Sequence, residues 1–323
     1  MVSIISPEMG SRNRCSSKNI KPMAWRISSR CGFCVGGVMI QGKSVSKVAI
    51  MADPREPDKL VAVQEAMDTL LGHLELLGVE AECFVNVPVK EMEPGDDVDL
   101  FVVMGGDGTM IHFAARLSQK NIPFYGLNYG NVGFMMNNPA EGLDVHARRM
   151  KTGDFFFREF PVLGVKTTDL QGNIHHGVGL NDIYLQRMTP QSCKANITLS
   201  GQSLKVNPVV CDGIVVATPL GSTAYNYNVT GSMVSIDAPV ITLTPVAALR
   251  TCPVSCMMLP METVIEFDIL EPKKRRVQVV SDGMSHGDLT HAEIRVSDRK
   301  VRICFDKEYS RNLPIRFINK ACS

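Results

Sequence analysis

The sequence predicts two consecutive domains: an α/β domain with a mostly parallel sheet, and then an all-β domain built as a sandwich. From residue 46 to about residue 150, short apolar segments alternate with segments of helical periodicity, which is the pattern of βαβ units. From about residue 155 onward, short segments of alternating polarity follow one another with turn residues between them and little helical pattern. That second pattern is typical of antiparallel sandwiches.

The α/β part is predicted to contain four strands and two helices. The strands are short and rich in β-branched and apolar residues, whereas the helical segments repeat their apolar residues every three or four positions. The strands are expected at 45–52, 79–85, 98–104 and 122–128, and the helices at 57–78 and 110–120. Ligands of parallel α/β sheets bind at the carboxyl ends of the strands, so the segments that follow these strands are the first places to look for a site.

The second part is predicted to consist of short strands alone. Each expected strand alternates polar and apolar residues, as a strand with one buried face does. The expected strands cover residues 157–168, 177–186, 194–201, 203–219, 240–246, 263–270, 275–283, 292–298 and 300–306.

The first 45 residues differ in composition from the rest of the chain. They carry seven basic residues and one acidic residue, Glu8, together with scattered serine and glycine. A basic, serine-rich and acid-poor start is typical of an organelle-targeting segment, but a disordered extension fits equally well. We therefore expect a disordered extension at 1–45, the α/β domain at 46–150 and the β-sandwich domain at 151–299.

Composition excludes several classes of partner. The formal net charge is +1 over 323 residues, so no general attraction to nucleic acid or to an anionic membrane is expected. No apolar run approaches the roughly 20 residues that span a membrane. Of the ten cysteines, only Cys31 and Cys34 form a CxxC pair, which leaves no matched set of ligands for a structural zinc. Reduced thiols in a cytoplasmic compartment are the expectation.

Three acidic, glycine-bearing motifs are candidates for function. The first is GGDGT, residues 105–109, directly after a predicted buried strand; the second is VVCDGIVVATPLGSTAYN, residues 209–226; the third is VVSDGM, residues 279–284. Glycine lets backbone N–H groups face a ligand without a Cβ in the way, and clustered N–H groups and hydroxyls bind phosphate and ribose oxygens. Asp-Gly is also a common turn dipeptide, so a structural role for each motif remains an alternative.

The position of Asp107 within GGDGT limits the reactions in which it could take part. The chain contains neither a Walker A loop nor a GxGxxG fingerprint, which removes the main support for a dehydrogenase. A carboxylate repels phosphate unless a metal ion or a proton-bearing hydroxyl stands between them. Asp107 could therefore hold Mg²⁺ or accept a proton from an attacking alcohol. Both roles belong to phosphoryl transfer onto a hydroxyl.

Five segments together resemble the NAD kinases of the bacterial type. They are MGGDGTMIHFAAR, YGLNYGNVGFMMN, LNDIYL, CDGIVVATPLGSTAYNYN and DAPVITLTPVAAL. The resemblance covers roughly residues 46 to 318 and implies transfer of the terminal phosphoryl group of ATP, or of polyphosphate, to the 2′-hydroxyl of the adenosine ribose of NAD, making NADP. It also implies a Rossmann-like, phosphofructokinase-like α/β domain before the sandwich, which would bind NAD, and a C-terminal segment, 300–323, that returns to the α/β domain.

The resemblance also implies roles for individual residues. Asp107 corresponds to the proton acceptor of the family, Gly108 to its loop partner, and His112 to a basic group near the phosphates. The remaining implied substrate-binding residues are Asn181, Asp182, Asp212, Thr223, Ala224, Tyr225, Asn226, Tyr227, Asn228 and Ala247. Asp182 stands where the family usually has the longer Glu. No residue is expected to ligate a resident metal ion, and Mg²⁺ or another divalent cation is expected to arrive with ATP.

Two other functions are compatible with parts of this pattern. Lipid kinases of the diacylglycerol and sphingosine type share GGDGT, but they carry a Gly-Thr-Gly-Asn-Asp signature soon after it, where this chain has GLNYGNVGF. A non-catalytic NAD(H)-binding sensor would keep the binding residues without turnover. The expected partners are NAD and ATP as small-molecule substrates and further copies of the same chain in a dimer or tetramer.

Overall fold

A computed structural model describes residues 40–53, 57–131, 133–204, 208–249, 255–282 and 284–321. Residues 1–39, most of the predicted extension, lie outside the described residues. The last six residues of that predicted extension belong to the fold instead: strand β1 (Ile40–Gln41) pairs with β6 (Phe156–Asp169), and Val45 is buried. The fold of the described residues therefore includes residues 40–45, which the sequence assigned to the extension.

The predicted parallel sheet is confirmed. Its strands lie in the order β3, β2, β4, β5, and every neighbouring pair among them is parallel. The strands are β2 (Lys47–Ala52), β3 (Glu80–Val85), β4 (Leu100–Gly105) and β5 (Phe124–Asn128). Because β2, β4 and β5 are apolar almost throughout, they are buried on both faces, as parallel strands covered by helices are.

Helices cover both faces of this sheet. Helices α1 (Pro57–Leu76) and α3 (Leu143–Thr152) share one apolar cluster with the strands, and α2 (Asp107–Leu117) and α5 (Lys307–Ala321) share another. The predicted helix at 110–120 begins three residues later than α2 does. Helices α3 and α5 were not predicted. Short 3-10 segments complete the connections: η1 (Val89–Glu91), η2 (Ser118–Lys120) and η3 (Pro139–Glu141).

The β-rich part is a sandwich of two sheets, as the sequence predicts. One layer is an antiparallel sheet in the order β14, β13, β12, β8, β16, β17. The other is made of β7, β6, β18, β15, β9, β10 and β11. Apolar side chains of both layers meet in one buried cluster, in which Ile183 and Leu185 of β8 face Phe267 of β15 and Ile294 of β18.

The strands of the sandwich follow the predicted segments closely, apart from the segments considered below. Their bounds are β7 (Ile174–Gly179), β8 (Asp182–Arg187), β9 (Cys193–Leu199), β10 (Gln202–Ser203), β11 (Val209–Cys211), β12 (Gly213–Ala217), β13 (Val240–Val246), β14 (Met257–Pro260), β15 (Ile265–Ile269), β16 (Val277–Ser281), β17 (Met284–His286) and β18 (Leu289–Phe305).

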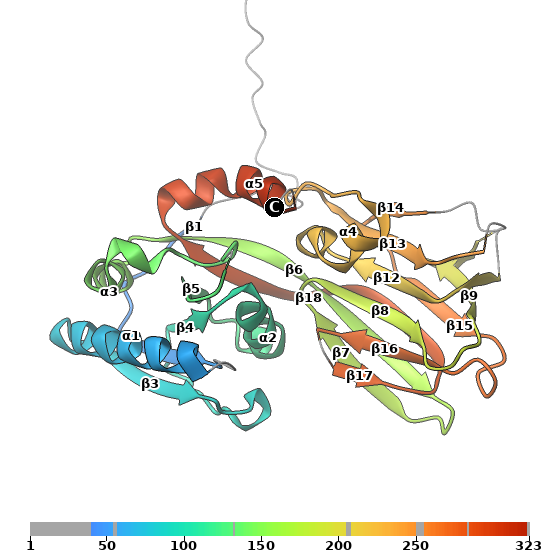
Figure 1. Cartoon of the computed structure of the whole chain (residues 1–323), viewed down its shortest axis with the longest axis horizontal. Helices are drawn as coiled ribbons and strands as arrows, with labels where there is room; N and C mark the ends of the chain where they lie inside the picture. Colours follow the sequence, from blue (N-terminus) through green and yellow to red (C-terminus); the bar gives the residue numbers. More distant parts are fainter. Residues whose placement is uncertain are drawn as a thin grey trace, which may run out of the picture. The chain divides into compact units, whose positions relative to one another are not determined.

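Two long strands connect the two parts of the fold. Strand β18 pairs with β6 along nearly its whole length, and its last residues also pair in parallel with β5 of the α/β part. Figure 1 shows β6 and β18 side by side, running from the helices α3 and α5 into the sandwich. The prediction of two separate strands at 292–298 and 300–306 is wrong, because an irregularity between Val296 and Lys300 interrupts the register without ending the strand.

Three further predicted segments differ from the structure. The single strand expected at 203–219 is three short strands, β10, β11 and β12. The strand expected at 177–186 is broken at Leu180 and Asn181, between β7 and β8. The GSTAY segment, for which no helix was predicted, forms a 3-10 turn, η4 (Leu220–Thr223), followed by the short helix α4 (Tyr225–Thr230).

None of the helices in the described part of the chain is both long and apolar enough to cross a membrane.

We expect the packing of α5 to contribute strongly to stability. Phe317 is 1% exposed, and its ring lies 5.3 Å from that of Phe134, centroid to centroid. Phe317→Ala should lower the free energy of unfolding by about 3–5 kcal/mol, because it leaves a cavity in a close-packed core. The control is Ile318→Ala, one residue on but 51% exposed, for which a change within about 0.5 kcal/mol is expected. Equal losses in urea unfolding of both variants would contradict the packing of α5 seen here.

Candidate functional site

Asp107 is the first residue of α2, directly after strand β4. Its two carboxylate oxygens accept hydrogen bonds from the backbone N–H groups of Phe134 (3.0 Å) and Met135 (2.7 Å). These bonds fix the orientation of the carboxylate and tie α2 to the segment after β5. A carboxylate has about four lone-pair positions, so these two hydrogen bonds do not by themselves use all of them.

The glycines around Asp107 meet different structural requirements. A Cβ on Gly105 would lie 2.8 Å from Oγ1 of Thr109, and one on Gly130 would lie 2.8 Å from Cα of Gly106. These close approaches require small residues for packing alone. A Cβ on Gly108, in contrast, would meet nothing within 4 Å. Gly108 therefore faces open space at a helix N-terminus, where backbone N–H groups favour an anionic ligand.

His112 lies on α2, one helical turn beyond Gly108. Its Nε2 is 3.3 Å from a guanidinium nitrogen of Arg116. His112 and Arg116 therefore lie on the same face of α2, the helix that begins with Asp107.

Leu180 and Asn181 form the turn by which the chain leaves one sheet of the sandwich and enters the other. The N–H of Leu180 donates to Oδ2 of Asp282 at 2.6 Å, and the N–H of Asn181 also donates to Asp282. On the other side, the hydroxyl of Thr218 donates to the Leu180 carbonyl at 2.7 Å, and the N–H of Thr218 donates to the Asn181 carbonyl at 2.9 Å. The polar backbone groups of the turn are thus satisfied, as burial requires.

Gly221 allows this turn to exist. A Cβ at position 221 would overlap the carbonyl oxygen of Asn181, so the glycine of the GSTAY segment is required by close backbone approach. The N–H of Ala224 donates to the Gly221 carbonyl at 2.9 Å. The turn at Asn181 and the segment that carries Thr223, Ala224 and Tyr225 are therefore held against each other.

Asp182 is the first residue of β8 and is 8% exposed. Burial raises the pKa of its carboxyl to about 7, and the nearby charge of Asp282 raises it further. Burial also raises the pKa of Asp282, to about 6, against the lowering effect of the two backbone N–H groups and of Arg116. The two carboxyls are thus close enough to interact.

One face of β8 connects this turn to a pocket. Asp182, Tyr184 and Gln186 alternate with Ile183 and Leu185, which point into the core of the sandwich, so the first three share the outer face. Asp182 and Gln186 are four residue steps apart along the strand, or about 13 Å. The ring of Tyr184 also lies 5.0 Å from that of Tyr225, centroid to centroid.

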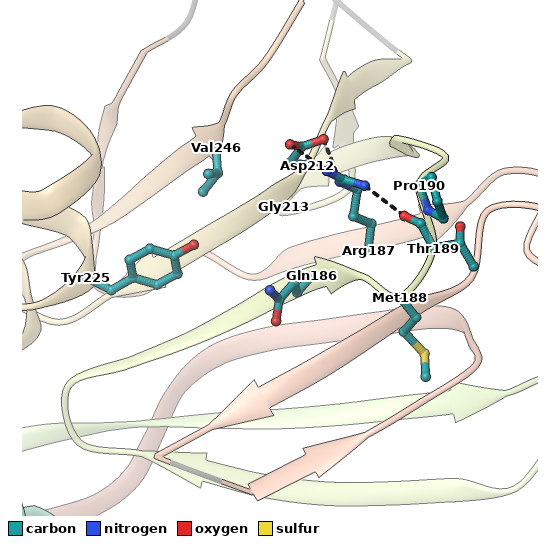
Figure 2. A pocket seen from close by; sticks show the side chains of 9 residues that line it. All are labelled: Gln186, Arg187, Met188, Thr189, Pro190, Asp212, Gly213, Tyr225 and Val246. Atoms are coloured by element: carbon teal, nitrogen blue, oxygen red, sulfur yellow. Dashed lines mark hydrogen bonds and ion pairs between the residues drawn. The ribbon is translucent and has the colours of Figure 1, made fainter.

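The pocket at the far end of β8 has a volume of about 440 Å³, within the range of about 300–1,000 Å³ that holds small molecules. Figure 2 shows its lining, with the charged pair of Arg187 and Asp212 on one wall and the Tyr225 ring opposite. The lining residues are Gln186, Arg187, Met188, Thr189, Pro190, Asp212, Gly213, Tyr225 and Val246. A lining that is more polar than apolar, with one aromatic ring beside it, suits a ligand that carries hydroxyls on a flat ring system.

The remaining predicted residues lie around η4, α4 and the end of β13. Thr223 and Ala224 precede α4, Tyr227 is half-buried, Asn228 is exposed, and Ala247, in the left-handed region with φ 48°, directly follows Val246 of the pocket. Asn226 differs from these, because its side chain is buried and its Oδ1 accepts a hydrogen bond from the Thr244 hydroxyl at 2.7 Å. The structure therefore gives Asn226 a supporting position behind α4.

Comparison with known proteins assigns both parts of the chain. A family model described as the ATP-NAD kinase N-terminal domain matches residues 61–155, and the ATP-NAD kinase C-terminal domain matches residues 180–304. The NAD kinase of Rhizobium meliloti is 33% identical over 216 residues, which are 67% of this chain and 82% of the relative. The NAD kinase of Brucella melitensis is 35% identical over 219 residues, with the same two shares. The chain belongs to the NAD kinase family.

Two solved NAD kinase folds resemble this one. The NAD kinase from Archaeoglobus fulgidus in complex with ATP superimposes with a TM-score of 0.65 at 24% identity, covering 84% of this chain and 98% of that one. The yeast NADH kinase complexed with NADH has a TM-score of 0.71 at 22% identity, covering 86% and 87%. At these identities the likeness shows the fold, which is an α/β domain followed by an antiparallel β domain.

Three residues beside the candidate site were not among the predicted site residues: Arg187, Asp282 and Tyr184. Only Asp282 carried a signal, since it belongs to the third acidic glycine motif. Arg187 and Tyr184 look like ordinary strand residues, and their positions become meaningful only when β8 is paired with β12.

We expect Asp182 to make the stability of this NAD kinase depend on pH. An Asp in the unfolded chain titrates near pH 3.9, whereas the carboxyl of Asp182 has a pKa of about 7 in the fold. Between these values the folded form binds more protons, so the free energy of unfolding falls as pH rises from about 4 to about 7. Asp182→Asn stays neutral and should reduce this fall, by on the order of 2 kcal/mol.

The measurement is thermal unfolding of wild type and variant, without substrates, at pH 5 and pH 8. Asp96→Asn is the control, because the Asp96 side chain is 99% exposed and its substitution should leave the pH dependence unchanged. The pKa of Asp282 is also raised, to about 6, so part of the Tm difference should remain in Asp182→Asn. A Tm difference as large as that of the wild type would show that Asp182 does not contribute to it.

Proposed function

We propose that the protein is an NAD kinase that uses Asp107 as the proton acceptor for the 2′-hydroxyl of the adenosine ribose of NAD. The activity, an ATP-dependent transfer of a phosphoryl group to an alcohol, follows from membership of the NAD kinase family. The observation that supports this role of Asp107 is its oriented carboxylate at the N-terminus of α2, next to the open space beside Gly108. Neither alternative function gains support from the comparisons.

NAD is proposed to lie along the outer face of β8. Its adenosine ribose would lie beside Asp107 and the turn at Asn181, and its other end would lie in the pocket lined by Asp212 and Tyr225. The row of Asp182, Tyr184 and Gln186 joins the two places over about 13 Å, a distance that an extended dinucleotide spans. The aromatic pair of Tyr184 and Tyr225 lies between them.

Charge and proton movement follow from this placement. The backbone N–H groups that hold Asp107 keep it pointed at the incoming hydroxyl, so the proton passes to the carboxylate as the hydroxyl oxygen attacks the terminal phosphorus of ATP. The bond from that phosphorus to the bridging oxygen breaks, and ADP leaves. The N-terminal N–H groups of α2 and the guanidinium of Arg116 offer positive charge to the phosphates, with His112 beside Arg116 on the same helix face. Positioning and charge stabilisation supply most of the acceleration in reactions of this kind.

The divalent cation belongs with the ATP. Within the described ranges, no three His, Cys, Asp or Glu side chains come together as a metal site. Mg²⁺ is commonly held by one or two carboxylates and the substrate phosphates. When bound, Mg²⁺ neutralises charge on the transferred phosphoryl group. The cytoplasmic location and the dimer or tetramer stay predictions, the second of which analytical ultracentrifugation would test.

The activity is tested by NADP formation from NAD, with ATP and with polyphosphate as donors in parallel. NADP should form with at least one donor and should require a divalent cation. NAD binding without any NADP would favour the non-catalytic sensor instead.

The role of Asp107 is tested with Asp107→Asn. We expect kcat to fall by about 100-fold or more, as is typical when a base is lost. The amide would turn an NH₂ toward one of the two backbone N–H groups, so a loss of about 1–3 kcal/mol in stability should accompany it. The matched control is Asp144→Asn, an acid in the first turn of α3, which should leave kcat unchanged. Near wild-type kcat in folded Asp107→Asn would overturn the assignment.

A further inference from the structure

Arg187 and Asp212, on the wall of the pocket, are joined by both side-chain and backbone contacts. The Nε of Arg187 lies 2.7 Å from Oδ1 of Asp212, and one terminal nitrogen donates to Oδ2 at 3.2 Å. The other terminal nitrogen donates to the Thr189 carbonyl at 2.9 Å. The backbone N–H of Arg187 also donates to the Asp212 carbonyl at 3.0 Å. Figure 2 shows this pair at the edge of the pocket.

The secondary structure explains why these two residues meet. Arg187 is the last residue of β8, and Asp212 is the single residue between β11 and β12. Gly213 pairs with Gln186 in the register of β12 and β8, which brings the next residue on β8 opposite Asp212. All three nitrogens of the guanidinium are used, so the guanidinium has one defined orientation, and a two-pronged contact of this kind also fixes the plane of the carboxylate.

Stability does not account for this pair. The side chain of Arg187 is 34% exposed and that of Asp212 is 40% exposed. Even a two-pronged ion pair is screened by water at this exposure, so its contribution to the free energy of unfolding is modest. Their position on the wall of the substrate pocket gives a better reason for the pair. A dinucleotide brings two negative phosphates, and a carboxylate without a cationic partner nearby would weaken its binding.

We propose that Arg187 is a positioning residue of the NAD pocket. It holds the carboxylate of Asp212 in one orientation, in which the remaining lone pairs accept hydrogen bonds from ligand hydroxyls, and it balances the charge of Asp212 in the presence of the diphosphate. Arg187 acts through Asp212 and needs no contact of its own with the ligand. The inference rests on the proposed binding of NAD along β8.

The test compares NAD affinity, measured by calorimetry without ATP, with kcat measured separately. Arg187→Gln should weaken NAD binding by about 5- to 20-fold, the scale of one charge-assisted contact in a half-exposed site, and leave kcat within about twofold. Arg187→Lys keeps the charge without the two-pronged geometry, so it should recover only part of the affinity. Arg276→Gln is the matched control, because Arg276 forms the same two-pronged pair with Asp288, at 2.5 and 2.9 Å, outside the pocket lining.

A double-mutant cycle with Asp212→Asn separates positioning from direct contact. If Arg187 acts through Asp212, Arg187→Gln should have no further effect on NAD affinity in the Asp212→Asn background. An equal loss in both backgrounds would overturn the proposal by showing direct contact with the ligand. An equal loss in Arg276→Gln, or no loss in Arg187→Gln, would overturn it as well. Wild-type protein that binds NAD without forming NADP would contradict the catalytic proposal alone, since this comparison measures binding.

Discussion

The two residues Leu180 and Asn181 are the constraint on which the candidate site depends. The chain changes from one sheet of the sandwich to the other within this turn, and both of its faces are held: the N–H groups by Asp282 and the carbonyls by Thr218. Only glycine fits at position 221, because any Cβ there would overlap the Asn181 carbonyl oxygen. The turn thereby fixes the register in which β8 begins at Asp182. The same contact fixes the segment that leads to Tyr225.

The parts of the fold that were predictable from sequence are those with local signals. Buried parallel strands appear as continuous apolar runs, and α1 shows the expected period. Helix α3 was missed because its segment, LDVHARRMKT, is largely polar, and α5 was missed because Pro314 interrupts its pattern. Strand β18 was divided in two because the polar residues of its bulge look like a turn. In each case tertiary packing outweighs the local preference.

The site was predictable where its chemistry lies in a compact motif. GGDGT and TPLGSTAY could be found because several unusual residues are adjacent, and Gly221 shows why one of them is needed. Arg187 could not be found this way, since its partner Asp212 is 25 residues away in sequence. The third motif pointed to Asp282 but not to its partner Leu180, which is 102 residues away. Their roles depend on the pairing of β8 with β12 and β16. The shift in the pKa of Asp182 has the same origin, because burial follows only from the folded arrangement.

The central claim is that one NAD molecule extends from Asp107, past the turn at Asn181, to the pocket of Asp212. A crystal structure of the protein with NAD tests it most directly. The claim predicts the 2′-hydroxyl of the adenosine ribose within hydrogen-bond distance of the Asp107 carboxylate, about 2.6–3.2 Å, with the opposite end of the dinucleotide between Tyr225 and Asp212. An NAD molecule held at Asp212 with its adenosine ribose turned away from Asp107 would contradict it.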